Sequence, residues 1–78
     1  MHKELVKAID LALAGEWEDA HKNVQVTENE TAYWIHAVLH KIEGDEDNSR
    51  YWYSRAGKMR HFGMDSTAEL QLIRSTLD

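Results

Sequence analysis

Apolar residues recur at the spacing of an α-helix along five segments of the chain. The pattern predicts helices over residues 3–14, 16–26, 30–43, 46–57 and 66–77. Glycine stands at or just beyond the ends of three of these segments, at Gly15, Gly44 and Gly57, as it commonly does after a helix. There is no proline, and short alternating segments typical of strands are missing. The chain is therefore expected to be all-α.

Short connections predict how these helices pair. The links around Gly15 and Gly44 are too short for anything but antiparallel neighbours, so residues 3–26 and 30–57 should form two helical hairpins. The helix over 66–77 would close a single domain spanning residues 1–78, and residues 58–65 would form a loop. Thr27 or Asn29 is a candidate N-cap for the third helix, and the segment 66–69 (Ser-Thr-Ala-Glu) has capping-box spacing.

The two hairpins are diverged copies of one unit. Gly44-Asp45 follows Gly15-Glu16 at an offset of 29 residues. The small, turn and aromatic positions resemble those of tetratricopeptide repeats, which are helical hairpins of about 34 residues. In the second unit these positions are Ala37, Gly44, Asp45, Ser49, Tyr53 and Ala56; in the first they are Ala8, Leu11, Gly15 and Ala20. The usual terminal proline is missing from both units.

A second resemblance covers roughly residues 15–60. The string W-I-H-A-x-L-H-x-x-E-G-D-x-x-N-x-x-Y-W-Y-x-R-A-G-K, over residues 34–58, is similar to that of a family of small bacterial proteins. This resemblance implies a bacterial cytoplasmic helical protein and implies no mechanism.

Charge and composition limit the classes of partner that the chain can bind. The formal net charge of -5 argues against nucleic acid and anionic membranes, which attract clustered positive charge. No apolar run approaches the roughly 20 residues that span a bilayer, and the N-terminal segment Met1–Glu4 is charged, unlike a signal peptide. There is no cysteine, so metal ligation would use histidine and carboxylate. We expect a cytoplasmic protein.

The third helix carries the most distinctive pair of residues. His36 and His40 are four residues apart, so both imidazoles lie on one helix face, and Glu43 shares that face. With Tyr53 and Arg55 nearby, this face is the candidate ligand site, and its first three residues are an alternative set of divalent-metal ligands. The simpler interpretation, which we favour, is that both histidines form hydrogen bonds at a packed helix interface. We therefore expect no cofactor.

The fourth helix combines aromatic and basic residues. The run Tyr51-Trp52-Tyr53 cannot enter one core, because consecutive helical residues point about 100° apart. Tyr51 should be exposed, and candidate partner-contact residues are Arg50, Tyr51, Lys58 and Arg60. These basic residues have a plainer role as complements to the helix dipole and to the acidic run nearby. Trp17 and Trp34 are expected in the core.

No motif for a nucleophile, a phosphate loop or paired carboxylates is present. The sequence therefore favours a non-catalytic protein-interaction module, which associates with another protein or with itself as a homodimer. The alternative is a small-ligand or divalent-metal-binding protein that uses His36, His40 and Glu43.

Overall fold

The computed structural model describes residues 3–77 and contains five α-helices and one short 3₁₀ helix in that part of the chain. The α-helices are α1 (Lys3–Leu13), α2 (Trp17–Val24), α3 (Glu30–Ile42), α4 (Glu46–Ala56) and α5 (Ser66–Thr76). The all-α prediction is confirmed, and every helix ends within two residues of its predicted bounds. The expected loop over 58–65 contains the 3₁₀ helix η1 (Met59–His61). The comparison with a signal peptide concerned residues 1–4, of which Met1 and His2 lie outside the described residues.

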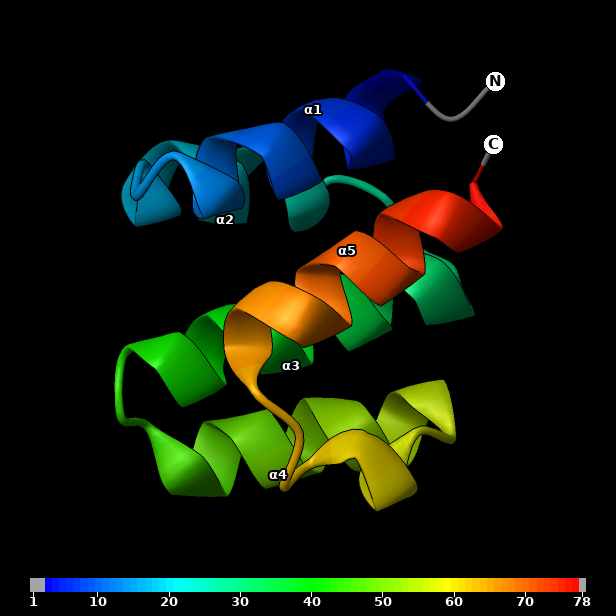
Figure 1. The fold of residues 1–78 in the computed structure, drawn as a ribbon. Coiled ribbons are helices and arrows are strands. Elements are labelled where there is room, and N and C mark those ends of the chain that lie inside the picture. Colours follow the sequence, from blue (N-terminus) through cyan, green and yellow to red (C-terminus); the bar gives the residue numbers. More distant parts are fainter. Residues whose placement is uncertain (1–2, 78) are drawn as a thin grey trace.

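The helices form layers around α3 (Figure 1). α1 and α2 lie side by side at one end of the molecule, and α4 packs along α3 at the other. α5 lies across α3 and reaches back to α1, so that Arg74 pairs with Asp10 at a nitrogen–oxygen distance of 2.9 Å. The tetratricopeptide-like arrangement of the hairpins stays a prediction.

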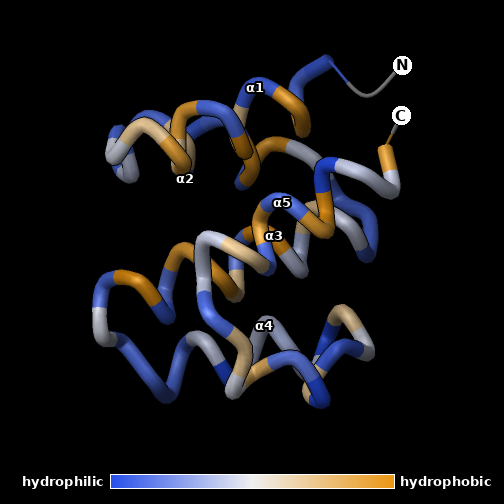
Figure 2. Tube along the Cα trace, viewed as in Figure 1, coloured by the Kyte–Doolittle hydropathy of each residue, from blue (hydrophilic) through white to orange (hydrophobic). Residues whose placement is uncertain are grey.

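One hydrophobic cluster connects all five α-helices. Hydrophobic and hydrophilic positions alternate along the helices (Figure 2), and α3 supplies more buried residues than any other described helix. Tyr53, Ile35 and Leu39 are fully buried, and Trp34 is 5% exposed, as expected. The expectation for Trp17 is wrong, since its side chain is 43% exposed. Trp17 is the first residue of the short helix α2, where it projects beyond the packed face.

Side-chain caps fix three helix starts. Asn29, Asp45 and Asp65 accept hydrogen bonds from the backbone N–H groups three residues later, which satisfies donors that a helix leaves free at its start. Asn29 was one of the two predicted caps. The predicted capping box at 66–69 is wrong, because Asp65 is the cap and Glu69 turns inward instead. At the other end of α4, Gly57 has φ +69°, the left-handed conformation that favours glycine.

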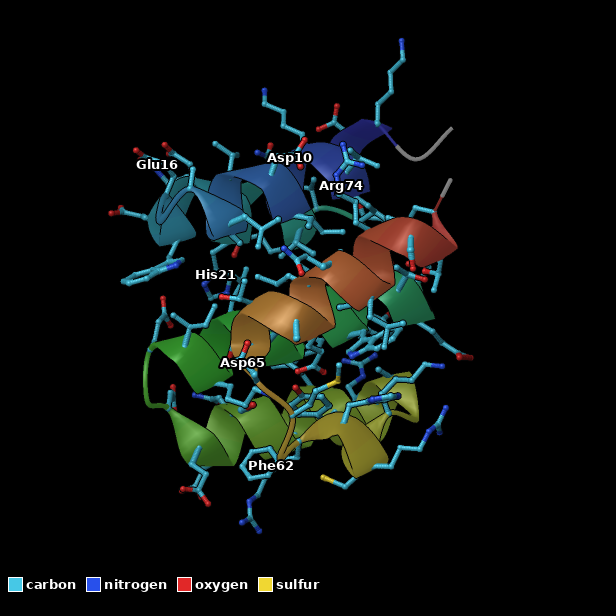
Figure 3. All side chains as sticks on the ribbon, viewed as in Figure 1. Asp10, Glu16, His21, Phe62, Asp65 and Arg74 are labelled. Atoms are coloured by element: carbon cyan, nitrogen blue, oxygen red, sulfur yellow. The ribbon has the colours of Figure 1, made fainter. Side chains whose placement is uncertain are left out.

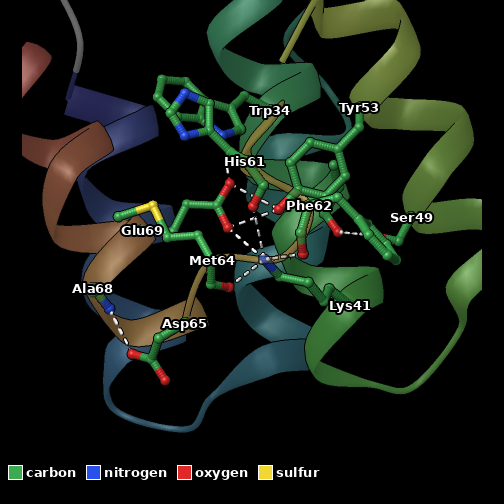
Figure 4. A network of polar contacts seen from close by, with 11 residues as sticks. Trp34, Lys41, Ser49, Tyr53, His61, Phe62, Met64, Asp65, Ala68 and Glu69 are labelled. Carbon is green, nitrogen blue, oxygen red and sulfur yellow. Dashed lines mark hydrogen bonds and ion pairs between the residues drawn. The ribbon is translucent and has the colours of Figure 1, made fainter. Parts of the chain in front are cut away.

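Glu69 is the centre of a buried polar network (Figure 4). Its carboxylate is fully buried and accepts hydrogen bonds from Tyr53 Oη at 2.7 Å and Trp34 Nε1 at 2.8 Å. Lys41 Nζ lies 2.6 Å from Glu69 Oε1 and also donates to the carbonyl oxygens of Phe62 and Met64. The network ties α3 to α4, α5 and the segment after η1. It therefore fixes one face of α3 and leaves the opposite face to other groups.

Candidate metal centre

Three histidines meet on the face of α3 that is turned toward α2. His36 and His40 come from successive turns of α3, and His21 projects from α2 toward them (Figure 3). One nitrogen of each ring can be chosen so that all three lie within 4.8 Å of one another. His36 is buried and the other two are half-buried. The sequence pattern brings two of these rings together, and the packing of the two hairpins supplies the third.

The rings form a compact stack. His36 lies between His40, at a centroid distance of 5.0 Å, and Trp52, at 4.1 Å, with all three rings nearly parallel. His21 meets the His36 and His40 rings edge-on, and its Nε2 lies 2.6 Å from Nε2 of His36. Trp52 therefore closes one side of the stack, which holds the His36 ring in a fixed plane.

The contact between His21 and His36 requires that the two rings share one proton. In this contact one Nε2 donates and the other accepts, so at least one ring is a neutral acceptor. A tetrahedral metal with metal–nitrogen bonds of 2.0–2.1 Å holds its ligand nitrogens about 3.3 Å apart. A metal ion would replace the shared proton if these two rings moved apart by a fraction of an ångström and the third ligand nitrogen, within 4.8 Å of the others, moved closer.

Burial favours the neutral form of two of the histidines. Burial is the main cause, and the neighbouring His21 and His40 add to it, so that the pKa of His36 is lowered to about 4. The pKa of His21 is also lowered, first by burial and then by His40, with Glu43 opposing the shift. Metal ligands must be deprotonated, so these rings are already in the state that coordination requires at neutral pH.

His40 has the orientation of a ligand held by carboxylates. Its Nδ1 is buried and makes no hydrogen bond, and it lies 3.5 Å from Asp45 Oδ2 and 3.6 Å from Glu43 Oε1. Hydrogen bonds from Asn48 hold the pKa of Asp45 below its usual value, which keeps this carboxylate charged. Metal-bound histidines commonly donate their second N–H to such a carboxylate. This leaves Nε2 of His40 for the other two rings.

The structure brings together some of the candidate ligand residues and separates others. His36, His40 and Glu43 are neighbours, and Arg55 lines a pocket with His36. Tyr53 is not part of this group. Its hydroxyl points to Glu69, and burial together with that carboxylate raises its pKa.

Three of the four candidate partner-contact residues are exposed, and Lys58 is half-buried. Tyr51 is 52% exposed, as predicted, and accepts a hydrogen bond from Arg55. Arg50 pairs with Glu46 and lies over the Phe62 ring. Lys58 lies over the Trp34 ring, and Arg60 is exposed on η1. Two of these cations thus cover aromatic rings next to the core.

Comparison with known proteins gives no relative. No protein-family model matches the chain, and no significant match was found among curated proteins or solved structures. No helix among residues 3–77 has the length and apolar character that a membrane crossing requires. Any function must therefore be argued from the site itself.

Proposed function

We propose that the chain is a non-catalytic protein that binds a divalent transition-metal ion of the zinc class. The ligands would be Nε2 atoms of His21, His36 and His40. The observation that supports this most directly is the convergence of three ligand nitrogens within 4.8 Å. Imidazole nitrogens suit zinc and its first-row neighbours, whereas magnesium and calcium prefer oxygen.

Two further contacts favour this proposal over a purely structural histidine cluster. Nδ1 of His40 is buried and lies just beyond hydrogen-bond distance of two carboxylate oxygens, on Asp45 and Glu43. With a metal on Nε2, that Nδ1 carries a proton and donates it toward Asp45 and Glu43. The two carboxylates also offset part of the positive charge that the metal brings into a half-buried site. A fourth ligand position remains for water or another small molecule.

Zinc is expected to stabilise the tag-free protein. A ligand that binds only the folded state at about 100 times its Kd adds about 2.7 kcal/mol to the free energy of unfolding. For a domain of this size the melting temperature should rise by roughly 10 °C or more. Isothermal titration calorimetry should give one zinc ion per chain, and His36→Ala should abolish both effects.

His61→Ala is the matched control. His61 belongs to η1, where its ring lies 5.1 Å from the Trp34 ring, far from the three-histidine site in the fold. This variant should bind zinc as the unmodified chain does. Equal loss of zinc in both variants, or no binding by the unmodified chain, would rule out the proposed centre.

As a second candidate function, we propose that the protein associates with a copy of itself through α1 and α5. An open groove of about 600 Å³ lies along α1 and is closed on one side by Leu77, which follows α5. Val6, Leu11 and Leu77 form its apolar wall, and Lys7 and Asp10 lie at its rim. In a two-fold antiparallel dimer, Lys7 of one copy faces Asp10 of the other. Asp10 also pairs with Arg74 of its own chain, so the contact from Lys7 would join an ion pair that already exists.

Sedimentation velocity measures this association. We expect the sedimentation coefficient to rise with protein concentration and Leu11→Glu to keep the protein monomeric, because it buries a charge in the apolar interface. Leu72→Glu, on an exposed position of α5 outside the groove, is the control and should still associate. A monomer at every concentration would contradict the dimer. The bacterial cytoplasmic location, the tetratricopeptide-like hairpins and the resemblance to small bacterial proteins are likewise proposals.

A further inference from the structure

A small pocket opens beside the three histidines. It has a volume of about 280 Å³ and lies between the end of α2, α3 and α4. Tyr33, His36 and Trp52 contribute aromatic walls, Val24 is apolar, and Glu28 and Arg55 are charged. The space suits a molecule of roughly ten non-hydrogen atoms, well below drug size. The aromatic walls favour a flat apolar ligand. The charged residues determine which polar group that ligand can carry.

Arg55 is exposed, lies over two aromatic rings and has unused hydrogen-bond donors. Its guanidinium lies 4.6 Å from the Tyr33 ring centre and 5.3 Å from that of Trp52. It donates one hydrogen bond, to Tyr51 Oη at 3.3 Å, and no carboxylate among residues 3–77 forms an ion pair with it. Stacking fixes the plane of a guanidinium, and its paired N–H groups match a carboxylate. The pocket therefore offers a prepared donor to an anionic group.

His36 links this pocket to the metal centre. Its Nε2 faces His21, so Nδ1 is the ring nitrogen left for the pocket that the ring lines. A metal on Nε2 forces the proton onto Nδ1, which makes that nitrogen a donor. In the absence of metal the proton shared with His21 can lie on His36 Nε2, and Nδ1 is then an acceptor that repels a carboxylate.

We propose that the pocket binds a small aromatic monocarboxylate, held by Arg55 and by the Nδ1–H of His36. The ligand carboxylate would accept a hydrogen bond from Nδ1–H of His36, as Asp45 and Glu43 would from Nδ1–H of His40. Glu28 at the pocket wall disfavours a dianion such as phosphate, because it adds like charge. The dependence on His36 rests on the proposed metal centre, whereas the contact with Arg55 does not. Metal and carboxylate should therefore each strengthen binding of the other.

Benzoate is the probe, and benzamide is its uncharged isostere. We expect benzoate to shift the indole N–H of Trp52 and the Nε–H of Arg55 in ¹H–¹⁵N NMR titrations of the full chain without metal, and benzamide to bind more weakly. Loss of a charge-assisted hydrogen bond in Arg55→Gln should weaken benzoate binding about tenfold. Arg50→Gln, an exposed α4 arginine outside the pocket, should bind benzoate unchanged. Loading with zinc should tighten benzoate binding.

The outcomes separate the two proposals. If zinc does not bind, the metal centre is wrong, and the titration without metal still tests the pocket. Equal binding of benzoate and benzamide, or unchanged binding by Arg55→Gln, overturns the carboxylate pocket. If zinc binds and leaves the affinity for benzoate unchanged, the role of His36 Nδ1 is overturned.

Discussion

Replacing Glu69 with leucine is expected to unfold much of the protein at 25 °C. Glu69 is fully buried and accepts from three donors, Lys41, Tyr53 and Trp34. Leucine leaves the Lys41 ammonium without its counter-charge and two polar hydrogens without acceptors. Removing one member of a buried ion pair costs about 3–5 kcal/mol, which is most of the stability of a domain this small. Urea denaturation followed by circular dichroism measures the loss.

Two variants make this prediction specific. Glu69→Gln keeps one acceptor oxygen and much of the shape but loses the charge, so it should retain more stability than Glu69→Leu. Glu18→Leu makes the same exchange at an exposed position of α2 and should change the free energy of unfolding by less than about 0.5 kcal/mol. Similar urea midpoints for Glu69→Leu and Glu18→Leu would show that the network contributes little.

The sequence predicts the helices well because their evidence is local. Apolar spacing and glycines at 15, 44 and 57 mark segments and turns without knowledge of what packs where. The role of Glu69 has no local sign. It is the fourth residue of α5, where an acidic side chain ordinarily caps the helix or complements its dipole. Only the placement of α5 over α3 brings it against Lys41 and Trp34.

The histidine cluster, too, is only partly predictable from the sequence. The spacing of His36 and His40 places two rings on one helix face, and this is visible in the sequence. His21 precedes His36 by 15 residues and occupies the inner face of a neighbouring helix, where a histidine among apolar residues is usually a packing residue. A scan for histidines on the inward faces of both hairpins would have selected it. The depth of the cluster and the stacking of Trp52 depend on tertiary packing.

Helix α3 therefore carries two polar groups of opposite character on its two faces. Lys41 faces a charged network that neutralises itself, with each buried charge paired. His36 lies on the other face, beside His21, and burial lowers the pKa of both rings. Protonation of His36 or His21 places a charge where burial disfavours it. Acid is thus expected to act on the fold through His21 and His36.

The free energy of unfolding should fall as pH drops from 6.5 toward 4 in the presence of a chelator. The pKa of His36 is about 4 in the folded chain against 6.5 for the ordinary side chain, so in this window the unfolded state binds more protons. Stability is therefore complete above pH 6.5 and decreases with acid, by about 3 kcal/mol in all from His36 alone. His21 adds to the loss in the same direction, since its pKa is also lowered.

The variant His36→Gln separates this effect from general acid denaturation. Glutamine cannot take up the proton, so the slope of stability against pH between 6.5 and 4.5 should flatten, whereas His61→Ala should keep the slope of the unmodified chain. Urea midpoints at a series of pH values give the comparison directly. With zinc in place of the chelator, the free energy of unfolding should fall more steeply as the pH drops, because each proton then also displaces the metal from a histidine. An identical slope in His36→Gln would contradict the view that burial of this ring, rather than titration of surface carboxylates, sets the acid limit of the fold.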